Sequence, residues 1–157
     1  MKKIRIMVIV VMLLGLILFV LTGCEKKTSK SYVFSVDTGD KIEIKMDTTG
    51  GDYDLTSKLP IEFSIDDEVV SQGTFGTEDA YDLYSDIWES DENAKLIEKK
   101  SRDNIKYIFY EYNGEAGTEY DYVIKIKHSD TCFILGNIES KSSAIEIFNR
   151  LEFIVSE

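Results

Sequence analysis

"IKYIFYEYNGEAGTEYDYVIKIKHSDTCFILGN", residues 105–137, contains three consecutive strand patterns. Apolar and polar residues alternate through residues 119–127, and the loop "NGEAGT" separates this run from "IKYIFYEY", which is typical of a β-hairpin. After the turn "HSD", the largely apolar run "TCFILGN" predicts a central strand, because strands buried on both faces lose the alternation. These residues therefore predict the middle of an antiparallel sheet.

Two further hairpins are predicted before this stretch. Apolar residues alternate at 32–36 and 42–46 around the turn "DTGD", and again at 61–65 and 69–75 around "DDE". Between the hairpins, "DTTGGDYD" consists mainly of turn-forming residues and predicts a loop.

Two segments change to a helical period. Thr77 is expected to cap a helix that ends near Glu89, and Ser140 or Ser142 is expected to cap a closing helix. The predicted apolar faces are formed by Ala80, Leu83, Tyr84, Ile87 and Trp88 in the first helix, and by Ala144, Ile147, Phe148 and Leu151 in the second. The end of the chain, "LEFIVS", also alternates, which predicts a last short strand after the helix.

The predicted order is four strands, a helix, three strands, a helix and a final strand. Runs of strands interrupted by single helices indicate the α+β class, an antiparallel sheet packed with two helices. This order, with a tyrosine-rich hairpin before a closing helix and a final "LEF" strand, resembles the PsbP-like α/β/α sandwich domains over residues 32–155. The resemblance implies an extracytoplasmic accessory or interaction role, and it carries no catalytic motif.

The N-terminus has the pattern of a bacterial lipoprotein. Three basic residues precede an apolar run that ends in Leu21, Thr22, Gly23 and Cys24. The apolar run alone is also compatible with an uncleaved transmembrane helix. The four final residues resemble the lipobox, the recognition site of the lipoprotein signal peptidase, and the whole chain resembles small clostridial-type lipoproteins. In that family the cysteine carries a diacylglycerol and becomes the new N-terminus.

We therefore expect three regions: a signal peptide at 1–23, a lipidated Cys24 with a short tether at 24–31, and a single globular domain at 32–157. Two acyl chains give stable anchoring, since each buried methylene contributes about 0.8 kcal/mol. The expected location is the outer face of the bacterial cell membrane. Lipidation of Cys24 would leave Cys132 without a disulfide partner, and we expect a buried thiol there.

The predicted domain is strongly acidic. Three of the 18 Lys and Arg residues precede the apolar run and all 29 acidic residues follow it, so residues from Cys24 onward carry a formal charge of −14. Nucleic-acid binding depends on Lys and Arg that displace counterions, so we do not expect it here. The remaining partners to expect are an envelope protein or a small ligand.

Recognisable enzyme motifs are absent from the sequence. The chain has one histidine, His128, in a predicted turn, so a hydrolase with a serine nucleophile and a histidine base would have to use this residue. No cofactor is expected. Asp47, Asp52 and Asp54 surround a Gly-rich loop and are weak candidates for a cation site, because the EF-hand spacing is missing.

The tyrosines are the other candidates for function. Tyr107 and Tyr110 differ in parity, so they lie on opposite faces of their strand, and we expect one set to leave the core. Exposed aromatic side chains often contact partners, which makes Tyr110, Tyr112 and Tyr120 a candidate partner surface. Cross-strand pairing under a helix is the alternative. The sequence thus predicts a non-enzymatic binding or accessory module, with a divalent-cation or small-ligand receptor as the alternative.

Overall fold

The computed structural model describes residues 26–156. The predicted signal peptide, the three residues Leu21, Thr22 and Gly23, and the lipidation site Cys24 lie outside these residues. Within the described part of the chain, no helix has the length and apolar character needed to cross a membrane.

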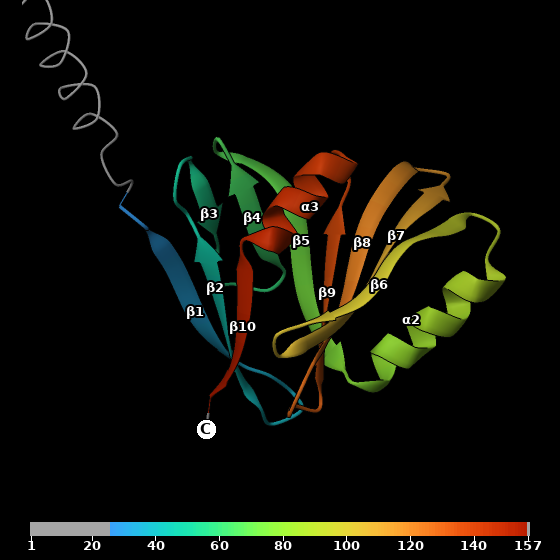
Figure 1. Ribbon diagram of the computed structural model, residues 1–157, viewed down its shortest axis with the longest axis horizontal. Helices are drawn as coiled ribbons and strands as arrows, with labels where there is room; N and C mark the ends of the chain where they lie inside the picture. Colours follow the sequence, from blue (N-terminus) through green and yellow to red (C-terminus); the bar gives the residue numbers. More distant parts are fainter. Residues whose placement is uncertain (1–25, 157) are drawn as a thin grey trace, which may run out of the picture.

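The described chain forms two antiparallel sheets and two helices, an α+β arrangement (Figure 1). The smaller sheet has the order β1-β2-β10, and the larger has the order β3-β4-β5-β9-β8-β7-β6. The strands of the smaller sheet are β1 (Ser29–Ser35), β2 (Lys41–Asp47) and β10 (Leu151–Ser156). Those of the larger are β3 (Tyr53–Leu55), β4 (Ile61–Ile65), β5 (Glu68–Thr77), β9 (Thr131–Asn137), β8 (Gly117–Ile126), β7 (Ile105–Gly114) and β6 (Ala94–Arg102).

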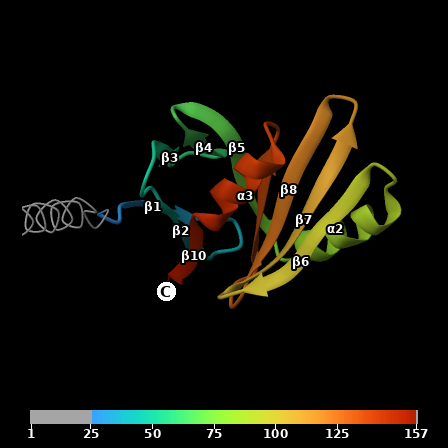
Figure 2. The same cartoon turned by 45° about the horizontal axis from the view of Figure 1, so that its top comes forward.

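The elements pack in layers around the larger sheet (Figure 2). The smaller sheet and helix α3 (Lys141–Asn149) share one large core with one face of the larger sheet. Helix α2 (Asp79–Ser90) lies on the opposite face, where Tyr81 packs in a second core with residues such as Ile108, Val123 and Cys132. Each helix therefore buries a different face of the same hairpin, β7 and β8.

Several predictions from sequence are confirmed. The three predicted hairpins form, as β1–β2, β4–β5 and β7–β8. The run "TCFILGN" is strand β9, which is the fourth of seven strands and therefore central. The final strand is β10, and Ser140 is the residue that caps α3.

Two strands were not predicted. Strand β3 forms inside the expected loop, and its three residues are too few to show an alternating pattern. Strand β6 is an edge strand whose pairing with β7 shifts between Leu96 and Glu98. Such an irregularity interrupts the alternation of side chains, so this polar segment has no clear period of two. Strand β1 also begins at Ser29, so residues 29–31 of the expected tether belong to the sheet.

The predicted face of the first helix was wrong in part, because Ala80 and Tyr84 of that face pack against the core but Leu83 and Ile87 do not. Leu83 and Ile87 are exposed, whereas Tyr81 is fully buried and Ala80 and Tyr84 pack beside it. The large Tyr81 side chain removes more apolar surface from water than a leucine would, which favours this orientation of the helix. Thr77 is the last residue of β5, and the N-cap is Glu78, whose side chain makes no capping hydrogen bond.

Candidate functional site

The three tyrosines of the predicted partner surface do not come together. Tyr110 and Tyr112 belong to the second core beneath α2, whereas Tyr120 packs against the large core on the opposite face. Tyr110 is only 5% exposed. The expectation that one set of tyrosines leaves the core is wrong, because a helix covers each face of the β7–β8 hairpin.

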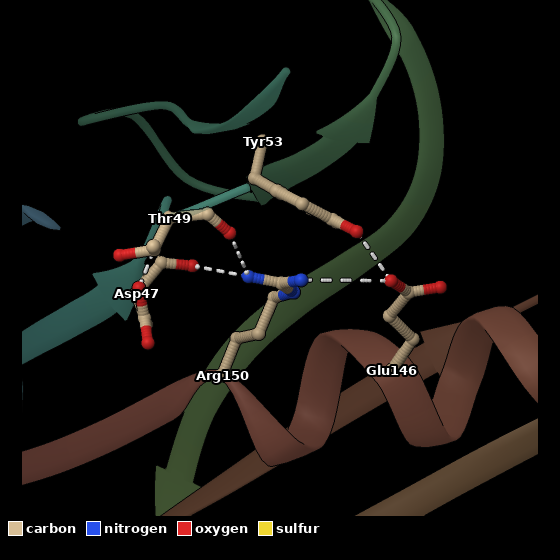
Figure 3. A network of polar contacts seen from close by, with 5 residues as sticks. All are labelled: Asp47, Thr49, Tyr53, Glu146 and Arg150. Atoms are coloured by element: carbon tan, nitrogen blue, oxygen red, sulfur yellow. Dashed lines mark hydrogen bonds and ion pairs between the residues drawn. The ribbon is translucent and has the colours of Figure 1, made fainter. Parts of the chain in front are cut away.

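The loop with the candidate cation ligands is organised by an arginine (Figure 3). Arg150, which follows α3, donates from Nη1 to the main-chain oxygens of Asp47 (3.2 Å) and Thr49 (3.0 Å), and its guanidinium stacks on Tyr53. Glu146 accepts a hydrogen bond from Tyr53 and pairs with Arg150 at 3.7 Å. The guanidinium therefore places a positive charge within this loop.

The carboxylates of that loop have other partners or lie apart. Asp47 accepts from the Thr49 amide at 2.8 Å, Asp54 pairs with Lys30, and Asp52 is exposed. In residues 26–156, no group of three or more His, Cys, Asp and Glu side chains is arranged to hold a metal ion.

The remaining candidates are His128 and Cys132. His128 is exposed in the turn between β8 and β9, where it borders a hollow beside β10 together with Arg102 and Lys127. Cys132 is fully buried, as predicted, and burial raises the pKa of its thiol to about 12. A thiol with such a pKa carries almost no thiolate at neutral pH, so its nucleophilicity is low.

Sequence reasoning missed a groove on the larger sheet. It has a volume of about 410 Å³ and runs across strands β4, β5, β9 and β8. Asp121 and Val123 share one face of β8, and Val123 packs beneath α2, so the groove opens on the same side of the sheet as α2. Its lining includes the side chains of Glu62, Val69, Gln72, Glu119, Asp121 and Ile138.

Asp121 is the unusual residue of this groove. It is 8% exposed and lies between Tyr110 on β7 and Gly136 on β9, its partners in the sheet. Burial raises the pKa of the Asp121 carboxyl to about 6; a hydrogen bond from Tyr110 lowers this pKa, and Glu119 raises it further. Carboxyl groups with raised pKa values beside a concavity are typical of functional sites.

The chemistry of the groove combines negative charge with apolar rims. None of the described residues that line it is Lys or Arg, and Glu62, Glu119 and Asp121 are acids. Val69 and Ile138, which are 50% and 77% exposed, both line this groove and give it an apolar rim. We refer to this concavity as the Asp121 groove.

A larger hollow of about 830 Å³ lies beside β10. Its polar groups already serve the fold: Arg102 donates to the main-chain oxygens of Phe148 (3.3 Å) and Leu151 (3.2 Å), and Asn104 donates to that of Phe153. These side chains therefore already hydrogen-bond main-chain oxygens at the end of α3 and in β10. The Asp121 groove, which holds a buried carboxyl and no basic residue, is therefore the better candidate.

No family model matches the chain, and no curated protein matches it in sequence. The functional assignment therefore depends on the residues themselves.

Proposed function

We propose that this protein is a lipoprotein on the outer face of the bacterial cell membrane, held by a diacylglycerol on Cys24. Its domain would act as a non-enzymatic binding or accessory module for another component of the envelope. The observation that carries the proposal is the sequence of Leu21, Thr22, Gly23 and Cys24 directly after a basic segment and an apolar run.

The start of the sheet is compatible with such an anchor. Strand β1 begins at Ser29, five residues after Cys24. Five residues span at most about 17 Å, so the domain would stay close to the lipid surface. The acidic domain would be repelled by anionic headgroups, so the lipid must provide the attachment.

We also propose that the domain belongs to the PsbP-like sandwiches. Support comes from the layers, with α2 on one face of the seven-stranded sheet and α3 on the other, and from the order of a tyrosine-rich hairpin, a closing helix and a final strand. This assignment would favour an accessory role over an enzymatic one.

Labelling of the full chain with a fatty acid in a bacterial host tests the anchor. The wild-type chain should incorporate label and appear in the membrane fraction, and Cys24→Ser should abolish the label, because the thiol is the acceptor. Cys132→Ser provides the control, since it changes the other cysteine of the chain. An unlabelled wild-type chain that keeps its N-terminal segment would contradict the proposal and indicate an uncleaved helix.

The Asp121 groove favours a second role, a receptor for a small ligand. Its volume of about 410 Å³ lies in the range of small-molecule sites, about 300–1,000 Å³. Because no described group of acidic side chains is arranged to hold a metal, an organic ligand fits this groove better than a divalent cation.

A further inference from the structure

We propose that the Asp121 groove binds a small organic cation, one with an ammonium or guanidinium group on a short aliphatic chain. This inference rests on the receptor role proposed above and names its ligand class. It is independent of lipidation at Cys24.

The charge inside the groove favours a cation. Asp121 is buried, yet no Lys or Arg is among the described residues that line the groove with it. A buried carboxylate without a cation is costly, and an ion pair offsets part of the cost of removing it from water. Glu119 and Glu62 add negative potential at the same place, so a cation is favoured there over a neutral molecule or an anion.

The rim of the groove is apolar. Val69 and Ile138 expose large aliphatic surfaces beside the carboxylates. A ligand with an aliphatic chain would cover these side chains while its charged group approaches Asp121, and burial of apolar area contributes about 25 cal/mol per Å². A hydrated metal ion could not make this contact, so the rim favours an organic cation.

Gly136 of β9 lies close beside the Asp121 carboxylate. A Cβ atom at position 136 would lie 3.0 Å from Asp121 Oδ1, closer than ordinary van der Waals contact, so the carboxylate would have to shift. The glycine at this position therefore leaves room for the carboxylate. One hydrogen bond from Tyr110 orients the same carboxylate, which keeps acceptor positions for a ligand.

Binding should depend on pH. The ionisable groups near Asp121 are Tyr110 of β7, Glu119 of β8, Glu62 of β4 and, through Tyr110, Tyr84 of α2. Burial raises the pKa of the Tyr110 hydroxyl well above its ordinary range, so this group stays protonated near neutral pH. A cation binds the ionised form of Asp121, so affinity should be constant above the pKa of about 6 and should fall at lower pH, by at most about tenfold per unit.

Calorimetry on the full chain in a non-ionic detergent tests the inference, with 1,4-diaminobutane as the probe. We expect saturable binding at pH 7.5 that weakens at pH 5. Asp121→Asn, which keeps the size of the side chain and removes its charge, should weaken binding by about tenfold or more. Asp86→Asn makes the same change on the exposed side of α2 and should leave the affinity unchanged.

Further measurements keep the result interpretable. If Asp121→Asn fails to fold, Ile138→Ala should still weaken the binding of 1,4-diaminobutane, because Ile138 is exposed at the rim. The inference would be overturned by no binding to the wild-type chain, by equal binding of 1-butanol, or by tighter binding of Ca²⁺ or Mg²⁺ at the same site. If 1,4-diaminobutane does not bind but Cys24 is labelled with fatty acid, the proposal of a lipid-anchored module stands and only the organic-cation ligand is rejected.

Discussion

At the scale of single residues, Asp121 is a carboxyl group in a place that favours its neutral form. The side chain is 8% exposed, and burial raises its pKa to about 6 from an ordinary value of 3.8. A raised pKa means that the folded protein holds a proton more tightly than the unfolded chain does. The ionised carboxylate therefore destabilises the fold, a cost that proteins commonly carry at binding sites.

This residue should give a measurable dependence of stability on pH. Because the pKa of Asp121 is higher in the folded state, its contribution should favour folding below about pH 4 and be lost as pH rises through 6. Asp121→Asn should remove this dependence and raise the free energy of unfolding at pH 7.5 by about 3 kcal/mol. Denaturant unfolding at several pH values measures this change in the free energy of unfolding. Identical pH profiles for the variant and the wild-type chain would contradict the assignment.

At the scale of elements, the two helices begin differently. In α3 the Ser140 hydroxyl accepts a hydrogen bond from the Ser143 amide at 3.1 Å. Asn137, at the end of β9, accepts from the amides of Glu139 and Ser140, each at 3.0 Å. Side chains thus accept from the Ser143 amide in the first turn of α3 and from the amides of the two residues before the helix, whereas α2 begins at Glu78 without a side-chain cap.

Ser140→Ala should lower the free energy of unfolding by about 1 kcal/mol, because the Ser143 amide loses its acceptor. Ser142→Ala is the control: this serine is exposed in the same turn, and its hydroxyl hydrogen-bonds the hydroxyl of Ser140 at 3.1 Å rather than a helix amide. Thermal unfolding of both variants distinguishes them. Equal melting temperatures for the two would show that the cap contributes nothing.

The elements also show which parts of the fold are readable in the sequence. Strand β9 was predicted as a central strand because its run of apolar residues reflects burial on both faces. Strand β6 was not predicted, because its pairing shift between Leu96 and Glu98 disturbs the alternation. Helix α2 was predicted, but its buried side depends on which side chains fit against β7 and β9, and this is a property of the packed molecule.

At the scale of the whole molecule, Asp40 connects the two sheets. It lies in the β1–β2 turn, and its carboxylate accepts hydrogen bonds from Ser129 (2.7 Å), Thr131 (2.8 Å) and the amide of Asp130 (3.0 Å), at the start of β9. Hydrogen bonds from Ser129 and Thr131 hold the pKa of Asp40 below its ordinary value. The carboxylate therefore stabilises the contact between the sheets while it is ionised.

Asp40→Asn should lower the free energy of unfolding by about 1 kcal/mol at neutral pH, since hydrogen bonds to a charged acceptor are replaced by weaker ones. The difference should shrink as pH falls below the ordinary carboxyl range, because protonation of Asp40 removes the same stabilisation from the wild-type chain. Asp37→Asn, an exposed acid in the same turn, provides the control. Denaturant unfolding checks both variants, and equal losses would contradict a specific role for Asp40.

The hairpins, both helices and the final strand follow from the sequence itself, because the periods of 2 and 3.6 residues are local properties. The sequence Leu21, Thr22, Gly23 and Cys24, on which we base the proposed lipid anchor, is likewise a local pattern. The Asp121 groove could not be predicted, because its acids come from β4 and β8, which are separated in the sheet by β5 and β9. The burial of Tyr110 also depends on strand order and helix placement, and so does the position of Arg150 among the loop carboxylates. These features arise only when residues far apart in the chain are packed together, since burial and charge contacts are set by spatial neighbours.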